Sequence, residues 1–446
     1  MWHWSRPSSR HWSRSGATLA SLLTVLVFVV SALAACGTSS AQATGPVNLT
    51  FWGFNQQITE QAALFNQSHP NIHVTGLKQD SGPNQYYPKV LTAVKAGNGP
   101  DVALIEYQYI PTLVSNGALV DLSKYGASSV KGQFADSAWA QVTQGSAVYG
   151  YPQDTGPMGL FYNTATFKKA GITSPPATWD EFAADAAKIH ALGKDYYIAT
   201  FPPQSTGWNQ ALMWQAGATW FSIDSAKNAW KVTINSDASK QVAQFWQNLV
   251  DKKLVATVAD FSNDWNAGLN SGKIASWPSA VWGQGVVSGS AKDTAGKWSV
   301  APMPQWSAGS NTTAMWGGSA ISVVGGSKHP KEAEEFVRWY LTDPGSLQIG
   351  VKEIGWFPSN TSARSFPEVT SPSAFYNNQV VDNVFINAAL PSNTWTWPPN
   401  LTAVNQFMGD DFNAAITNHT GLPAALDKLQ QQVVQDMQQN GINVEQ

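Results

Sequence analysis

Aromatic side chains stand beside carboxylates and amides at two early positions, a combination that suits binding of a neutral, hydroxyl-rich ring. The two groups are Trp52, Asn55 and Gln56, and Glu106, Tyr107 and Gln108. A flat aromatic ring can stack on the C–H face of a sugar, while carboxylates and amides hydrogen-bond its hydroxyls. We therefore expect these six side chains to form part of a carbohydrate site. The alternatives are a core position for Trp52 and a surface ion pair for Glu106.

Tryptophan is abundant, with 21 in 446 residues. Trp316 precedes Gly317 and Gly318, and two glycines allow the backbone amides to approach a ligand hydroxyl closely. Trp208 and Trp214 share one stretch of sequence, and tryptophans at helical spacing are more often core residues than ligand contacts. We expect one of these two to contact the ligand and place Trp208 among the candidates. So many aromatic rings favour an oligosaccharide over a single sugar.

Motifs of the common hydrolases are absent from the sequence. It contains no G-x-S-x-G nucleophile elbow, no H-E-x-x-H helix and no His/Cys cluster at metal-ligand spacing. We therefore expect a binding protein without metal or cofactor rather than an enzyme. A secreted glycoside hydrolase stays open as the alternative, because its paired carboxylates would meet only in space. The glycine-rich stretch 283–289 is one residue too long for a dinucleotide fingerprint and predicts a loop.

The charge pattern favours an uncharged ligand. The net charge of −3 gives no basic surface for nucleic acid. Beyond residue 35 the chain has two arginines, Arg338 and Arg364. Arginine is the residue most suited to phosphate and carboxylate groups, so its scarcity argues against an anionic ligand. A peptide or a polyamine bound by the same fold remains an alternative, although the excess of acidic site residues that a polyamine would require is not visible.

Alternating strand and helix patterns must position these side chains. Short apolar runs predict strands at 47–52, 72–74 and 101–105. Helical patterns lie between them at 58–66 and 87–96. This βαβ order favours a parallel sheet covered by helices, in which ligands bind beyond the carboxyl ends of the strands. The ends of the first and third strands lead directly into the two groups of candidate residues.

The same rhythm restarts after Pro152. The later predicted elements are strands at 159–162 and 319–324, a helix behind a capping box at Thr178 and Glu181, and helices after Ser236 and from Pro330. The chain is longer than one hydrophobic core ordinarily serves. We therefore predict an α/β fold of two lobes, each a helix-covered and mostly parallel sheet, with the ligand cleft between them.

The first 46 residues predict export and membrane attachment. Three arginines precede an uncharged apolar run at 17–35, the layout of a signal peptide over 1–35. The run Leu33-Ala34-Ala35-Cys36 resembles the bacterial lipobox, in which the cysteine becomes the lipidated first residue. Cys36 is the only cysteine, and residues 36–46 predict a flexible tether. The alternative is a membrane-spanning helix at 17–35.

A series of short motifs resembles extracellular solute-binding proteins of sugar ABC transporters, the family that includes maltose- and maltodextrin-binding proteins. They are Leu49-Thr50-Phe51-Trp52, Gly99-Pro100-Asp101-Val102, Leu119-Val120-Asp121-Leu122, Tyr151-Pro152, Phe161-Tyr162-Asn163, 176–182, Gly272-Lys273-Ile274-Ala275, Trp316-Gly317-Gly318 and Ala333-Glu334-Glu335-Phe336. The resemblance implies lobe one at 47–154 and 303–355, and lobe two at 155–302 and 356–446. It also implies that the lobes close on the ligand like a hinged clamp.

The resemblance implies further site residues and partners. Asp154 and Thr155 fall at the first crossing between lobes, where relatives often place a ligand-binding carboxylate. Trp282 matches an aromatic position, and late loops that often present stacking aromatics hold Trp356, Trp395 and Trp397. The implied partners are a carbohydrate ligand, the permease subunits of an ABC importer and their cytoplasmic ATPase. The protein would be a monomer on the outer face of the cell membrane, attached through lipid at Cys36 alone.

Overall fold

The computed structural model describes residues 45–55, 57–79, 83–354, 357–388, 390 and 395–445, and the chain from Pro46 onward forms one compact unit. Among these residues, no helix is both long enough and apolar enough to cross a membrane. The predicted signal peptide, Cys36, Gln56 and Trp356 lie outside the described residues, as does the tether except for its last two positions.

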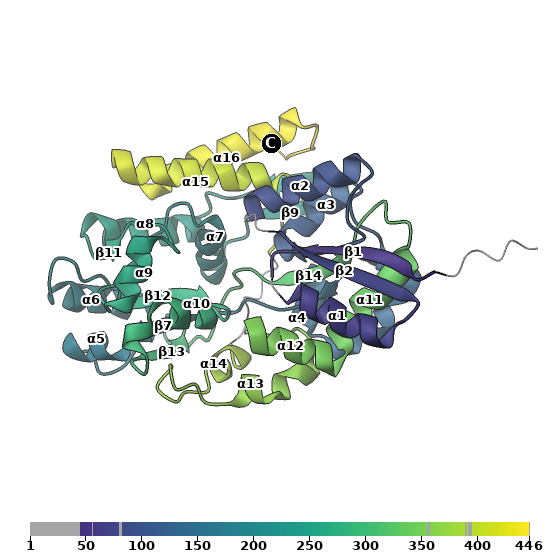
Figure 1. The fold of residues 1–446 in the computed structure, drawn as a ribbon. Coiled ribbons are helices and arrows are strands. Elements are labelled where there is room, and N and C mark those ends of the chain that lie inside the picture. The colour runs from purple at the N-terminus through teal and green to yellow at the C-terminus, as the bar shows by residue number, and fades with distance from the viewer. Residues whose placement is uncertain are drawn as a thin grey trace, which may run out of the picture. The chain divides into compact units, whose positions relative to one another are not determined.

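A five-stranded sheet organises the first part of the chain (Figure 1). Its strands are, in order, β2 (Ile72–Lys78), β1 (Val47–Gly53), β3 (Val102–Glu106), β14 (Ser319–Val323) and β6 (Tyr151–Pro152). β1 pairs in parallel with β2 and β3, as predicted, and β14 runs antiparallel to β3 and β6.

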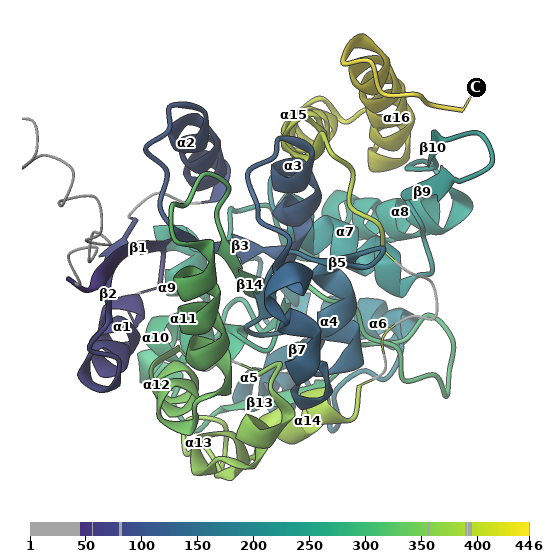
Figure 2. The ribbon, with the colours of Figure 1, turned by 90° about the vertical axis from the view of Figure 1, so that its right-hand side faces the viewer.

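Helices cover both faces of this sheet, which is why residues 102–105 of β3 are all buried. On one side lie α2 (Pro83–Lys95) and α3 (Ile110–Ser115), and on the other α1 (Ile58–Ser68) and α11 (Pro330–Thr342) (Figure 2). The Phe336 ring of α11 lies edge-on to Phe51 of β1 and Phe65 of α1, with centroids 5.7 and 5.0 Å apart. The apolar faces predicted for these helices thus meet in one core.

The second group of strands differs from the prediction. β12 (Ser276–Ala280), β7 (Met158–Asn163) and β13 (Trp298–Pro302) form a sheet in which both outer strands run antiparallel to β7. The short strands β8 (Ala199–Thr200) and β11 (Val255–Ala256) pair in parallel beside it. The prediction of a mostly parallel sheet is wrong for this group. Periodicity identifies a strand, but its direction depends on which partner it meets.

Two helices predicted from the sequence, one behind the Thr178 capping box and one after Ser236, are present. Thr178 Oγ1 accepts from the Glu181 N–H at 3.1 Å, and the Glu181 carboxylate accepts from the Thr178 N–H at 3.3 Å, so the capping box of α6 (Trp179–His190) is confirmed. Ser236 caps α8 (Asp237–Asp251). Further described elements of the whole chain are helices α4 (Asp136–Gln141), α5 (Thr164–Lys169), α7 (Thr206–Gln215), α9 (Asn263–Asn270), α12 (Pro344–Ile354), α13 (Pro367–Thr370) and α14 (Asp382–Ile386), the hairpin of β4 (Thr143–Gln144) and β5 (Ala147–Val148), and 3-10 turns at Tyr107–Tyr109, Leu122–Tyr125, Ala127–Gln133, Lys292–Thr294 and Thr361–Ser365.

The glycine-rich stretch forms helix α10 (Gly283–Ser290) and not the predicted loop. A β-carbon at Gly283 would lie 2.9 Å from the Ser279 hydroxyl and 3.1 Å from the Trp277 ring, so glycine lets the helix begin directly against β12. Val287, one turn on, is fully buried in the same core. This packing outweighs the low helix propensity of glycine.

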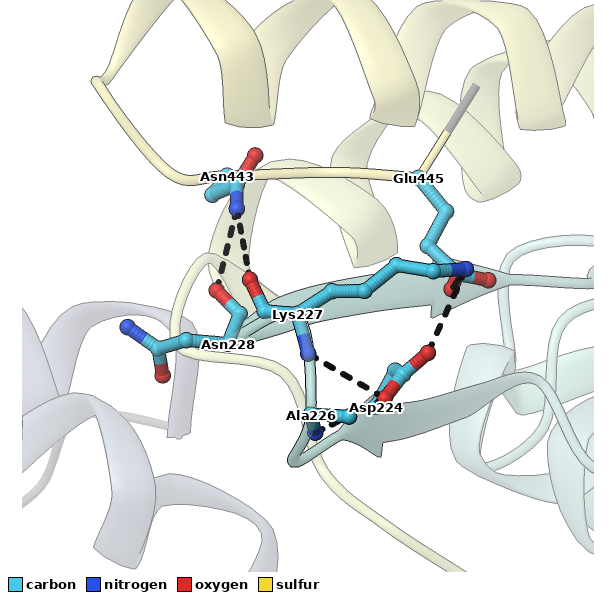
Figure 3. Close-up of polar contacts among 6 residues, drawn as sticks. All are labelled: Asp224, Ala226, Lys227, Asn228, Asn443 and Glu445. Carbon is cyan, nitrogen blue, oxygen red and sulfur yellow. Dashed lines mark hydrogen bonds and ion pairs between the residues drawn. The ribbon is translucent and has the colours of Figure 1, made fainter.

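Two long helices, α15 (Leu401–Asn418) and α16 (Leu422–Gln439), lie side by side near the C-terminus (Figure 1). The chain then returns to the hairpin of β9 (Phe221–Asp224) and β10 (Ala229–Val232). Lys227 Nζ lies 2.7 Å from a Glu445 oxygen and 3.3 Å from Asp224 Oδ2 (Figure 3). Asn443 Nδ2 donates to the backbone oxygens of residues 227 and 228. These contacts hold residues 443–445 against the β9–β10 hairpin.

Candidate functional site

Glu106, the last residue of β3, lies in a network of neutral polar groups. The Tyr87 hydroxyl donates to Glu106 Oε2 at 3.3 Å and accepts from the Glu106 N–H at 2.8 Å, while Gln108 Nε2 donates to Oε2 at 3.3 Å. Burial raises the pKa of Glu106 to about 7, although these hydrogen bonds oppose the rise. No ion pair joins Glu106 to a described lysine or arginine. Its carboxyl can therefore still accept from a ligand hydroxyl.

Asp154 is a second carboxyl close to the first. Its Oδ1 accepts from the Ser319 N–H at 2.9 Å, and its backbone oxygen accepts from the Tyr107 hydroxyl at 2.7 Å. Burial raises the pKa of Asp154 to about 6, and the Asp154 charge contributes to the raised pKa of Glu106. Gly318 has φ of +100°, and a β-carbon there would lie 2.7 Å from the Tyr107 ring. The structure thus brings Glu106, Tyr107, Asp154 and Gly318 together.

Trp316 and Trp282 form a half-buried aromatic pair. Their ring centroids lie 4.6 Å apart at 65°, and Trp282 Nε1 donates to the Trp316 backbone oxygen at 2.9 Å. Gly317 has φ of +80°, and a β-carbon there would lie 3.3 Å from Trp282 Nε1. A β-carbon at Gly207, in the first turn of α7, would lie 3.0 Å from Trp316 Nε1, so Trp316 also packs against that helix. Part of each indole remains available to a ligand.

A hollow of about 10 Å³ lies next to Tyr107 and Gly318. Its wall is formed by Tyr107, Gln108, Gln141, Trp214, Met315, Gly317, Gly318 and Trp397. Through Gln141 and Trp397 it adjoins a larger hollow of about 600 Å³, which Trp230 and Trp395 also line. The first space is smaller than one sugar ring, so a sugar would enter it only after its walls separate.

The remaining tryptophan candidates occupy different environments. Trp208 is fully buried, its Nε1 donates to the Pro278 oxygen at 2.8 Å, and its ring lies 5.0 Å from Trp246. The core alternative considered for Trp208 therefore fits this structure, and Trp214 lines the hollow in its place. Trp395 is 3% exposed, whereas Trp397 is half-buried and donates from Nε1 to Gln141 at 3.3 Å.

Three further candidates, Trp52, Asn55 and Thr155, do not line the hollow. The Trp52 ring is partly exposed, with Lys89 Nζ 5.2 Å from its centroid. Neither Trp52 nor Asn55 is among the residues that line the hollow. Thr155 is buried and donates from its N–H to the Phe357 oxygen at 3.0 Å. Gln141, in contrast, lines both hollows and was missed, because a glutamine in a short helix gives no sequence signal.

Comparison with known proteins assigns the chain to a class. Residues 53–346 match the model of the family described as bacterial extracellular solute-binding protein. The chain is 28% identical over 360 residues to a lactose-binding protein of Rhizobium radiobacter, covering 77% of this chain and 82% of that protein. It is 24% identical over 333 residues to an arabinooligosaccharide-binding protein of Bacillus subtilis (strain 168), covering 71% and 74%.

Two solved structures of sugar-binding proteins superpose closely. The galacto-N-biose-/lacto-N-biose I-binding protein of Bifidobacterium longum, bound to lacto-N-biose, has a TM-score of 0.81 at 30% identity, covering 90% of this chain and 99% of that one. The ABC transporter associated binding protein of B. animalis subsp. lactis Bl-04, bound to β-1,6-galactobiose, has a TM-score of 0.79 at 27% identity, covering 90% and 100%. The predicted two-domain α/β fold is confirmed.

Proposed function

The chain belongs to the family of bacterial extracellular solute-binding proteins, and we propose that it captures a neutral oligosaccharide and delivers it to an ABC importer. The observation that carries this proposal is the pairing of Glu106 and Asp154, two carboxyls without a described cationic partner, with the partly exposed ring pair of Trp282 and Trp316. Carboxylates accept strong hydrogen bonds from hydroxyls, and indole rings stack on sugar C–H faces.

The proposed contacts extend to the other candidates. Gln108, Gly317 and Gly318 would supply amide groups, and Trp397 a further aromatic face. Trp52, Asn55, Gln56 and Trp356 are retained from the sequence as proposed ligand contacts. Trp395 and Thr155 would support the site from the core, because both are buried. Trp208 is not retained, because Nε1, the one polar atom of its side chain, already donates a hydrogen bond within the core.

The proposed mechanism is closure of two lobes, 47–154 with 303–355 and 155–302 with 356–446. Asp154 forms an isolated β-bridge with Pro358, next to the first and third boundaries, and Pro157 forms one with Met315, in the segment that follows the second boundary. Three chain segments therefore run together at one place. Closure would shrink the site around the sugar, and the importer could then distinguish a loaded from an empty receptor.

Location and partners follow as part of the same proposal. The chain would be exported by the signal peptide at 1–35 and attached to the outer face of the membrane through lipid at Cys36, followed by the tether. It would act as a monomer that docks on permease subunits. Members of this family are binding proteins, and a hydrolase is the competing function that the same carboxyl pair could serve.

Calorimetry on residues 36–446 carrying Cys36→Ser tests the proposal directly. The panel is lacto-N-biose, β-1,6-galactobiose, lactose and arabinotriose, chosen from the ligands of the similar proteins, with spermidine and glutamate as non-sugar controls. We expect one sugar class to bind and to remain intact on chromatography. At 100 times its dissociation constant, the sugar should stabilise the fold by about 2.7 kcal/mol. Cleavage of a sugar would establish the hydrolase, and binding of the controls alone would refute the sugar assignment.

A further inference from the structure

Arg364 is one of the two arginines beyond residue 35, and the proposed sugar site does not use it. Its Nε donates to the Pro358 backbone oxygen at 3.2 Å, and its guanidinium carbon lies 5.0 Å from the centroid of the Phe357 ring. The side chain is half-buried. A guanidinium over an aromatic ring and a charge-assisted hydrogen bond each stabilise the conformation in which they form. Arg364 therefore stabilises the local conformation of residues 357 and 358.

The segment that Arg364 contacts passes from one hydrophobic core to another. Phe357 is buried in the core around β7, with its ring centroid 6.4 Å from that of Phe385. Asn360 is attached to the side of the first sheet, because its Nδ2 donates to the Leu341 oxygen of α11 at 3.0 Å. Two residues lie between these anchors. A change in the relative position of the two cores would therefore alter the backbone at these two residues.

The residues around Arg364 pack on the side of the first sheet. Ala363 is fully buried in a small core with Leu347 and Val351 of α12. In turn, α12 packs on α1 and α11, which cover one face of the first sheet. Residues 361–365 thus lie with the first core, although they follow the proposed boundary at 355. The Arg364 side chain extends from this core to Phe357, which belongs to the other.

The same segment is paired with a carboxyl of the candidate site. Pro358 forms the β-bridge with Asp154, and two backbone hydrogen bonds of 3.0 and 3.1 Å flank the bridge, donated by the N–H groups of Thr155 and Ser359. The Tyr107 hydroxyl contacts both strands, since it donates to the Asp154 backbone oxygen at 2.7 Å and lies 3.4 Å from Ser359 Oγ. A displacement of Pro358 would therefore move Asp154 as well.

We propose that Arg364 is a positioning residue, which holds residues 357–359, and through them Asp154, in the conformation that binds sugar. The inference rests on the proposed function, because it concerns the same site. Arg364 acts through the backbone and does not touch the sugar. Loss of its contacts would lower the population of the binding conformation, so every sugar would bind more weakly by the same factor.

The test uses two substitutions of Arg364 and a matched control. Arg364→Met keeps a long apolar side chain but removes the charge and the donors, whereas Arg364→Lys keeps a cation. Arg338→Met is the control, because the contacts of Arg338 stay within one core: its Nε lies 3.2 Å from Glu334 Oε1, which also accepts from the Tyr151 hydroxyl. Each protein starts at residue 36 and carries Cys36→Ser.

Three measurements are made on each protein. Calorimetry gives the affinity for lacto-N-biose, β-1,6-galactobiose, lactose and arabinotriose, and urea unfolding gives the stability. Amide hydrogen exchange without sugar, followed by mass spectrometry on peptides that span Thr155 and Ser359, reports the two backbone hydrogen bonds beside the Asp154–Pro358 bridge. This last measurement needs no ligand, so it tests the effect of Arg364 on the segment even if no sugar binds.

We expect Arg364→Met to lower affinity about tenfold for every sugar that wild type binds, and to speed exchange in both peptides about tenfold. Arg364→Lys should recover part of both effects, because an ammonium group can still lie over Phe357 and donate to Pro358. Arg338→Met should lower the urea midpoint but leave affinity and exchange in these peptides as in wild type.

Four outcomes would count against the inference. Unchanged exchange in Arg364→Met would refute it, whether or not any sugar binds. Faster exchange with unchanged affinity would show that Arg364 has only a structural role. An affinity loss that differs between the sugars would indicate that Arg364 contacts the sugar directly. If wild type binds none of the sugars, the proposed function fails and the effect on affinity fails with it, while the exchange rates still decide whether Arg364 holds residues 357–359.

Discussion

Replacing Glu106 by glutamine should stabilise the sugar-free protein at neutral pH. The amide oxygen can still accept from Tyr87 and Gln108, so the hydrogen-bond network keeps its acceptor. What disappears is the charge, which burial makes unfavourable: the pKa of Glu106 is raised from 4.5 to about 7. The same substitution should weaken sugar binding about tenfold, because a charge-assisted hydrogen bond is lost.

The sign and size of this effect depend on pH. Below about pH 4 the carboxyl is protonated in both the folded and the unfolded chain, and the charge has no influence on stability. As pH rises from 4.5 to about 7, the unfolded chain ionises first, so wild type is progressively destabilised. The gap between the two pKa values corresponds to about 3 kcal/mol at most. Since Glu106 keeps some solvent contact, we expect Glu106→Gln to gain about 1–3 kcal/mol over wild type at pH 8 and little at pH 4.

Urea unfolding of both proteins at pH 4, 6 and 8 measures this difference, with Glu60→Gln as a control at an exposed position in the first turn of α1. The advantage of Glu106→Gln should grow with pH, and the control should show no such growth. An advantage that is the same at all three pH values, or one that shrinks as pH rises, would refute the argument that burial of this charge destabilises the fold.

Three further substitutions test other parts of the structure. Gly318→Ala should destabilise the fold by about 1–3 kcal/mol in urea unfolding and abolish sugar binding. The reason is that a β-carbon would lie 2.7 Å from the Tyr107 ring, at a φ of +100° that alanine rarely adopts. An unchanged unfolding midpoint would contradict this prediction. Thr178→Ala should cost about 1 kcal/mol through loss of the α6 cap, seen as a lower urea midpoint at constant slope, with sugar affinity unchanged. Lys227→Met should lower the midpoint less than Thr178→Ala does, because Lys227 is largely exposed, and the effect should diminish further in high salt.

Sequence patterns predicted local structure well where a single segment determines it. The strand at β1, the capping box at Thr178 and the helix after Ser236 depend on residues within a few positions, and all three are confirmed. Predictions failed where contacts with segments far away along the chain determine the structure. The antiparallel pairing around β7 and the helix at 283–290 both depend on packing against segments far away along the chain.

The positions of the candidate site residues were likewise predictable only where the nearby sequence determines them. Glu106 and Tyr107 could be located in the fold because they lie at the carboxyl end of β3, which pairs in parallel with β1. Trp208 and Trp214 could not be separated, since both lie on one helix and only the packing partners decide which ring reaches the core.

A raised pKa does not by itself mark a ligand contact in this protein, as Asp382 shows. Burial raises the pKa of Asp382 to about 6, close to that of Asp154, yet Asp382 begins α14 and accepts from Gln284 Nε2 at 3.2 Å. What distinguishes Glu106 and Asp154 is their position, Glu106 at the end of β3 and Asp154 at the proposed crossing between the lobes. If the proposed function holds, a sugar hydroxyl would replace the water that burial removed, and binding would recover the stability lost in the sugar-free protein.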